Sequence, residues 1–259
     1  MMQTPEPVHA EAARYATSLL FLPGLWAGPE LWRGAATYLA HRGWESGLVD
    51  LRTAVGGIAS RAQQVADCAA GLPAPPVLVG HDAGGLVALA AARRGPSAAV
   101  VLVAPQAPGQ AVERAMVLGI APFLALLRRR PVPAPEGWRA ARLLGDLPGA
   151  ARSQLGADDP AAIWDVTWRR AFVPGVKVPT LLVVGDRDPL LSLPAARALA
   201  ATVGAEEGVV AGAGHWPHLS PTWSALVNLV HRWLIQRLGE PLLEQYANAM
   251  AERDADDDT

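Results

Sequence analysis

The chain has 259 residues, of which 51% are hydrophobic and 18% charged, and its formal net charge is −2. This balance excludes a disordered chain, and it offers no electrostatic basis for binding nucleic acid or a membrane surface. The single cysteine, Cys68, excludes an intramolecular disulfide framework and favours a reducing compartment. We therefore expect a compact cytoplasmic protein that is long enough to form one large domain.

Short apolar runs alternate with segments of helical periodicity through the first hundred residues. The apolar runs predict strands at 17–22, 44–50, 77–79 and 98–103. The segments between them predict helices at 30–42, 57–71 and 84–94. This alternation predicts an α/β fold with a mainly parallel central sheet flanked by helices on both faces.

The alternation of predicted strands and helices stops after residue 105. The stretch 106–172 contains no convincing strand and is punctuated by prolines, which predicts a helical cap inserted into the α/β core. The strand–helix pattern then resumes with predicted elements at 178–184, 193–203, 207–211 and 221–238. The expected organisation is a core formed by 17–105 and 173–240, the cap 106–172, and terminal extensions 1–16 and 241–259. The first extension shows no signal-peptide pattern.

Three loops that follow predicted strands carry residue types suited to catalysis. The first reads GHDAG at 80–84, the second GDRDP at 185–189, and the third GAGHWPH at 212–218. The first has the G-x-S-x-G spacing of a sharp strand-to-helix turn that lifts its central side chain above a sheet. Because ligands bind at the carboxyl ends of parallel strands, we expect the three loops to converge.

The central residue of the first loop is Asp82 rather than a serine. A serine hydroxyl suits acyl transfer, whereas a carboxylate suits displacement at an alkyl carbon, which leaves an alkyl ester on the enzyme. The pattern therefore locates a reactive side chain and indicates a different chemistry for it.

Over roughly residues 17–238 the chain resembles the α/β-hydrolase fold superfamily, because the three loops follow its order of nucleophile, acid and histidine. The sequence GHDAGG at 80–85 is similar to the aspartate-nucleophile branch, which contains epoxide hydrolases, haloalkane dehalogenases and fluoroacetate dehalogenases. The resemblance implies an α/β-hydrolase fold with a helical cap insertion.

The resemblance also implies roles for the loop residues. Asp82 would attack an electrophilic carbon, and His215 would then take a proton from the water that hydrolyses the ester. Asp188 would orient His215; we prefer it to Asp186 because the later acid of this loop usually faces the histidine.

The remaining site predictions concern main-chain donors and the substrate pocket. The backbone N–H groups of Leu25 and Ala83 are the expected oxyanion donors. The tryptophans predicted to contact substrate are Trp26, Trp138, Trp164 and Trp168. Their alternative interpretation is packing in the core or in the pocket wall.

Two departures from the family leave the reaction open. None of Tyr15, Tyr38 and Tyr246 lies in the predicted cap, where epoxide hydrolases keep the tyrosines that protonate the leaving oxygen. Ala83 stands where haloalkane dehalogenases place a tryptophan and fluoroacetate dehalogenases an arginine. The cap arginines are interpreted mostly as a solvated face, one of which could meet an anionic substrate: Arg128, Arg129, Arg130, Arg139 and Arg142.

The favoured function is epoxide hydrolysis of a small apolar molecule, without a metal or other cofactor. Three alternatives stay open at this point: a dehalogenase, a repurposed cyclase, lyase or isomerase of secondary metabolism, and a non-catalytic ligand receptor. We expect no nucleic-acid or membrane partner, and a homodimer formed through the exposed face of the cap also stays open.

Overall fold

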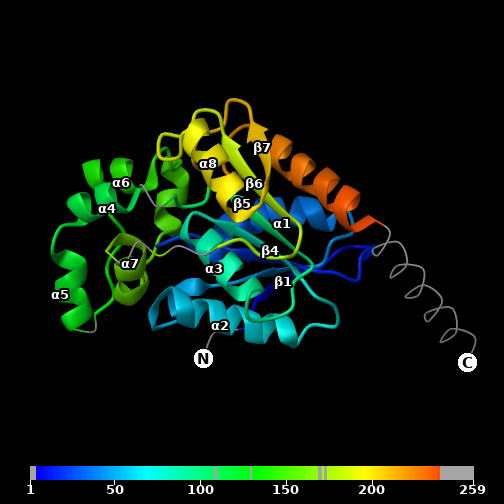
Figure 1. Ribbon diagram of the computed structural model, residues 1–259, viewed down its shortest axis with the longest axis horizontal. Helices are drawn as coiled ribbons and strands as arrows, with labels where there is room; N and C mark the ends of the chain where they lie inside the picture. The colour runs from blue at the N-terminus through cyan, green and yellow to red at the C-terminus, as the bar shows by residue number, and fades with distance from the viewer. Residues whose placement is uncertain (1–3, 108–109, 129, 169–170, 172–173, 240–259) are drawn as a thin grey trace, which may run out of the picture.

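A computed structural model describes residues 4–107, 110–128, 130–168, 171 and 174–239 (Figure 1). Its centre is one sheet with the strand order β1-β3-β2-β4-β5-β6-β7. The strands are β1 (Glu6–Val8), β2 (Leu19–Leu22), β3 (Ser46–Leu48), β4 (Val77–His81), β5 (Ala99–Val103), β6 (Thr180–Gly185) and β7 (Glu206–Val210). Every neighbouring pair is parallel except β1 and β3. The predicted mainly parallel sheet is confirmed.

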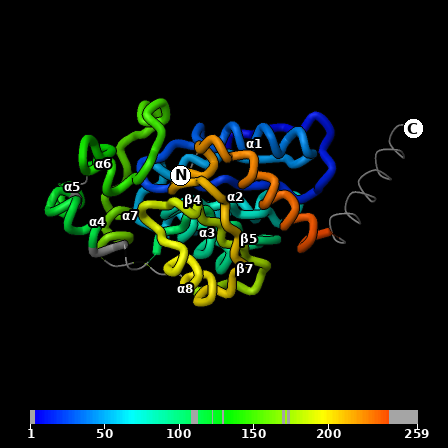
Figure 2. Tube along the Cα trace, turned by 90° about the horizontal axis from the view of Figure 1, so that it is seen from above, coloured from blue at the N-terminus to red at the C-terminus, as the bar shows by residue number. Residues whose placement is uncertain are grey.

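Side chains alternate along each central strand, so both faces of the sheet are apolar and both are covered. In β2, Leu20 and Leu22 point into one core, whereas Leu19 and Phe21 point into the other. The first core is covered by α2 (Gly57–Ala70), α3 (Ala83–Ala92) and α8 (Leu193–Val203). The second is covered by α1 (Arg33–Ala40) and by a helix over 223–239, and Figure 2 shows these two helices side by side.

Strand β1 was not predicted, because Pro7 lies inside it. The strand is an antiparallel edge strand in which Pro7 faces Gly47, and an edge is where a sheet tolerates a residue without an N–H donor. Two predicted elements were also too long. The predicted helix 30–42 begins with a 3-10 turn, η1 (Pro29–Trp32), and the predicted strand 44–50 is reduced to β3.

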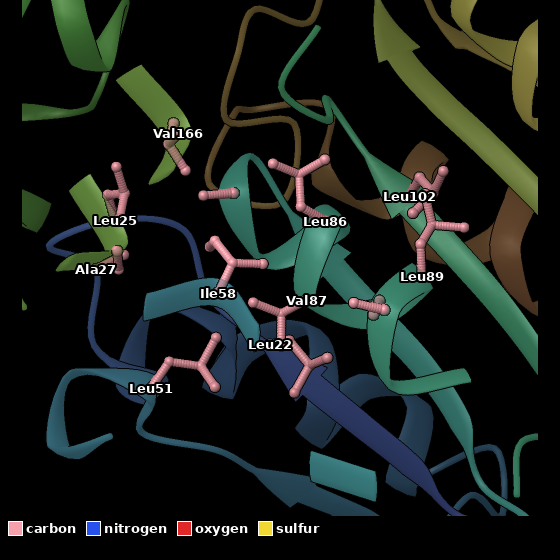
Figure 3. Close-up of a cluster of buried hydrophobic side chains, with 14 of the residues drawn as sticks. Leu22, Leu25, Ala27, Leu51, Ile58, Leu86, Val87, Leu89, Leu102 and Val166 are labelled. Carbon is pink, nitrogen blue, oxygen red and sulfur yellow. The ribbon is translucent and has the colours of Figure 1, made fainter. Parts of the chain in front are cut away.

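Residues 110–167 form a group of helices at one end of the molecule (Figures 1 and 2). They are α4 (Gln110–Leu118), α5 (Ala121–Leu127), α6 (Gly137–Leu144), the 3-10 turn η3 (Gly149–Gln154) and α7 (Pro160–Thr167). We call them the α4–α7 segment. Figure 3 shows Val166 of α7 beside Leu25 and Ala27, which follow β2, so this segment shares the first core of the sheet.

A further 3-10 turn, η2 (Leu51–Thr53), leads from β3 towards α2, and Asp50 caps it by accepting from the backbone N–H of Arg52. Among the described residues no helix is both long and apolar enough to traverse a lipid bilayer.

Candidate active site

Asp82 occupies a strained turn between β4 and α3. Its backbone has φ 48° and ψ −121°, a conformation that a residue with a side chain rarely adopts. The turn is possible only beside glycines, because a Cβ on Gly80 would lie 2.3 Å from the carbonyl oxygen of Gly84. A Cβ on Gly84 would lie 2.2 Å from that of Leu22. The fold therefore maintains strain at the position where the sequence predicts the reactive group.

The Asp82 carboxylate is buried and faces a cation. Its side chain is 8% exposed, and Nη2 of Arg114 in α4 donates to its Oδ1 at 2.5 Å. Burial raises the pKa of this carboxyl, but its polar surroundings, above all the charge of Arg114, outweigh burial and leave the pKa below its ordinary value. Asp82 is therefore an anion in the folded protein at neutral pH.

His215 and Asp188 form a buried pair on the other side of Asp82. Nδ1 of His215 lies 3.0 Å from Oδ2 and 3.2 Å from Oδ1 of Asp188, which fixes the orientation of the ring. Its Nε2 lies 3.9 Å from Oδ1 of Asp82, beyond hydrogen-bonding distance. Asp186 instead accepts from the backbone N–H of Gly212 at 2.7 Å. The structure thus brings Asp82, His215 and Asp188 together and places Asp186 in a turn.

Two further histidines pack behind the site. Nε2 of His81 lies 2.9 Å from the carbonyl oxygen of His215, and the ring of His218 stacks on Trp32 with centroids 4.0 Å apart. Burial lowers the pKa of His81 to about 4, and burial also lowers the pKa of His218. Both rings are therefore neutral at physiological pH and support the site as packing groups.

The loop after β2 passes directly beside the carboxylate. A Cβ on Gly24 would lie 2.9 Å from Cβ and 3.1 Å from Oδ2 of Asp82, so only a glycine allows this approach. Leu25 follows in this loop, and the backbone N–H of Ala83 interacts with the Asp82 carboxylate. Gly24 thus brings the loop that contains Leu25 beside Asp82, and Ala83 follows Asp82 at the start of α3.

Trp26, which was predicted to contact substrate, is engaged in contacts with the α4–α7 segment. Its side chain is fully buried, and its Nε1 donates to the carbonyl oxygen of Val132 at 3.2 Å. Its backbone N–H donates to Asp158 at 2.7 Å, and its carbonyl oxygen accepts from Gly156 at 2.9 Å. Its φ of 63° is held by these bonds. Trp26 therefore joins the loop after β2 to the α4–α7 segment.

The other predicted pocket tryptophans also lie differently. Trp138 is 65% exposed and packs under Arg139, which excludes it from a buried pocket. Trp164 and Trp168 are half-buried and stack on each other with centroids 4.9 Å apart, and Trp164 also contacts Phe123. The alternative interpretation, packing, describes these rings better.

Sequence reasoning missed three charged residues of the α4–α7 segment that hold the site. Arg114 binds Asp82, Asp146 accepts from the backbone N–H of His215 at 2.8 Å, and Asp158 forms a buried ion pair with Arg61. Arg114 carried a signal, because it lies at helical spacing from buried Val117 and Leu118 and thus on the apolar face of its helix.

The arginines that were noted in the sequence and that the structure describes lie at the surface. Arg142 is exposed and pairs with Glu113 at 2.8 Å, Arg128 and Arg130 are exposed, and Arg129 lies outside the described residues. Tyr15 stacks on Trp44 and Tyr38 donates to Asn228, while Tyr246 lies outside the described residues.

A hollow of about 830 Å³ lies at the opposite end of the sheet, lined by Ser18, Ser46 and Cys68 among others. Ser18 precedes β2, Ser46 begins β3 and Cys68 belongs to α2, so the hollow opens at the amino ends of the strands, away from Asp82 and His215. Within the described part of the chain, no group of three or more His, Cys, Asp or Glu side chains is arranged to hold a metal ion.

Comparison with known sequences decides the family: the alpha/beta hydrolase family matches residues 19–225. The chain belongs to the alpha/beta hydrolase family. A comparison with curated proteins gives no match.

Solved structures agree on the fold of this alpha/beta hydrolase. An esterase from Thermogutta terrifontis is 19% identical with a TM-score of 0.65, covering 91% of this chain and 98% of its own. A monoacylglycerol lipase from Paleococcus ferrophilus is 16% identical with a TM-score of 0.68, covering 92% and 99%. MenH from S. aureus is 17% identical with a TM-score of 0.67, covering 91% and 99%.

Proposed function

We propose that this protein hydrolyses epoxides through an alkyl ester on Asp82, which places it in the aspartate-nucleophile branch of its family. The observation that carries the proposal is an Asp82 carboxylate that is paired with Arg114 and lies 3.9 Å from Nε2 of His215. A serine needs a base within hydrogen-bonding distance, about 2.6–3.2 Å, to remove its proton. A carboxylate needs none, so His215 is left to activate water.

The proposed reaction has two steps. An oxygen of Asp82 attacks a ring carbon, the ring carbon–oxygen bond breaks, and the released oxygen takes a proton from solvent. His215 then removes a proton from water, and the hydroxide attacks Cγ of Asp82. The diol leaves with the proton that His215 holds, and the carboxyl group returns a proton to solvent because its pKa is lowered. Backbone N–H groups of Leu25 and Ala83 would stabilise the intermediate oxyanion.

Two indole N–H groups near the site, those of Trp26 and Trp216, are already bonded and are not free to bind a departing halide. A departing halide needs N–H donors that are free to bind it. Nε1 of Trp26 already donates to Val132, and Nε1 of Trp216 donates to the carbonyl oxygen of Leu144 at 2.6 Å. A strained epoxide ring supplies part of the driving force itself and depends less on such a cradle.

The test is to trap the ester. In His215→Gln incubated with an epoxide such as styrene oxide, we expect the protein mass to rise by the mass of the epoxide, with the adduct on the peptide that contains Asp82. The exposed His41→Gln is the matched control and should turn over without accumulating an adduct.

Isotope labelling decides between the alternatives. Over many turnovers in ¹⁸O-water, the wild-type Asp82 carboxylate should take up label, and full turnover with an unlabelled Asp82 would refute the covalent step. Halide release with the same adduct would assign a dehalogenase. A product without solvent oxygen would assign a cyclase, lyase or isomerase, and binding without turnover would assign a receptor.

A further inference from the structure

Arg114 is a buried cation whose hydrogen-bonding capacity is only partly used. Its side chain is 4% exposed, and its Nη2 donates to Asp82. Its Nη1 is buried and has no hydrogen-bond partner among the described residues. A guanidinium is permanently charged and carries five N–H donors, and leaving a buried donor unpaired is costly. The site is therefore suited to a ligand that accepts a hydrogen bond at Nη1.

A small surface hollow borders Arg114, whose Nη1 lies buried beneath the surface. It is lined by Glu113, Arg114, Arg142 and Leu190. Leu190 also belongs to the loop that holds the acid of the site, since its backbone N–H donates to Asp188 at 2.7 Å. The exposed pair Arg142–Glu113 stands at the pocket, so an entering anion meets one attracting and one repelling charge before it reaches Arg114.

We propose that Arg114 is a carboxylate-binding residue, so that the substrate is an epoxide with a carboxylate attached to the ring. The epoxide in this proposal rests on the proposed function, whereas the carboxylate-binding site rests on Arg114 alone. Arg114 replaces the expectation of a wholly apolar substrate with that of an anionic one.

The position of the carboxylate next to the ring follows from the shape of the guanidinium. Nη1 and Nη2 are attached to the same carbon atom, so a carboxylate at Nη1 is the direct neighbour of the Asp82 carboxylate at Nη2. The ring carbon attached to that carboxylate then comes within attacking distance, about 3–3.5 Å, of an Asp82 oxygen. A second anion also competes for the guanidinium, which weakens the bond from Nη2 to Oδ1 of Asp82 and frees that oxygen to attack.

The subsite is tested with unreactive ligands, so that turnover is not required. Calorimetry on the full chain should show that isobutyrate binds and that the isosteric amide, isobutyramide, does not. Arg114→Gln should weaken isobutyrate at least about tenfold, the effect of one charge-assisted hydrogen bond. Arg114→Lys, which keeps the charge, should retain part of the affinity. The exposed Arg139→Gln is the matched control and should bind like the wild type.

A third variant covers the case in which Arg114→Gln fails to fold. In Asp82→Asn, Arg114 loses its anionic partner, so isobutyrate should bind more tightly than in the wild type. A purely structural Arg114 predicts no such gain. Equal affinity for isobutyrate and isobutyramide, or no tightening in Asp82→Asn, would overturn the carboxylate subsite.

Turnover experiments separate this proposal from the proposed function. The wild type should hydrolyse glycidate with a higher kcat/KM than glycidamide, and Arg114→Gln should remove that preference. If isobutyrate binds as expected but neither epoxide alkylates Asp82, the subsite stands and epoxide hydrolysis fails. If neutral epoxides alkylate Asp82 but isobutyrate does not bind, epoxide hydrolysis stands and the carboxylate subsite fails.

Discussion

Acidification is expected to destabilise the fold through the histidines that pack behind Asp82. Burial is the main cause that lowers the pKa of His81 from 6.5 to about 4. Unfolding exposes this ring, so the unfolded state binds more protons than the folded state between pH 4 and pH 6.5. The contribution of the neutral His81 ring to the free energy of unfolding is complete above pH 6.5 and is lost as the pH falls through this window. It corresponds to about 3 kcal/mol, of which about 2 kcal/mol is lost between pH 7.5 and pH 5.

The assay is urea unfolding of wild type and His81→Gln between pH 5 and pH 8. The amide of glutamine can still donate to the carbonyl oxygen of His215, and any packing cost of the substitution is independent of pH. Near pH 5.5 the slope of the unfolding free energy against pH should be smaller in the variant than in the wild type by about 1.2 kcal/mol per pH unit. His218 is present in both proteins, so the part of its pH dependence that burial causes is common to both. The exposed His9→Gln serves as control. Parallel stability curves for wild type and His81→Gln would refute the reasoning.

Two further predictions concern the site itself. Gly24→Ala places a methyl group 2.9 Å from Cβ of Asp82 and should lower kcat about a hundredfold in a folded protein. The control Gly34→Ala in α1 meets open space and should keep full activity with slightly higher stability. Equal activities of the two variants in an epoxide hydrolysis assay would contradict the close approach of Gly24 to Asp82. Asp188→Asn should lower kcat by about 10³–10⁴, as loss of the orienting acid does in serine triads. Asp186→Asn should mainly lower the melting temperature. A larger loss of kcat in Asp186→Asn than in Asp188→Asn would exchange the roles of the two residues.

The local features of the site were predictable because each depends on a short stretch of chain. The strained turn at Asp82 is specified by its own flanking glycines, and the apolar run before it is long enough to define a strand. Parallel pairing then brings the loops after β4, β6 and β7 to one edge of the sheet, where His215 and Asp188 meet. The edge strand β1 was missed because it is short and contains Pro7, so it carries no apolar alternation.

The α4–α7 segment was the least predictable part, because its contacts join residues that are far apart in the chain. Trp26 pairs with Val132 and Asp158, and no periodicity in the sequence indicates either contact. The sequence does not distinguish an exposed tryptophan from a buried one. Trp26 and Trp138 therefore received the same predicted role, although Trp26 is fully buried and Trp138 is 65% exposed.

The sequence by itself determined the fold class and the place of the reactive carboxylate, since hydrophobic periodicity and glycine spacing are local properties. Only the tertiary structure decided what that carboxylate faces. Arg114 is 32 residues from Asp82, and the two meet because α4 docks its apolar face beyond the carboxyl end of β4 and takes one arginine into the interior with it. A buried cation needs an anion, and this pairing, which depends on docking rather than on any motif, defines the chemistry that we propose for the substrate.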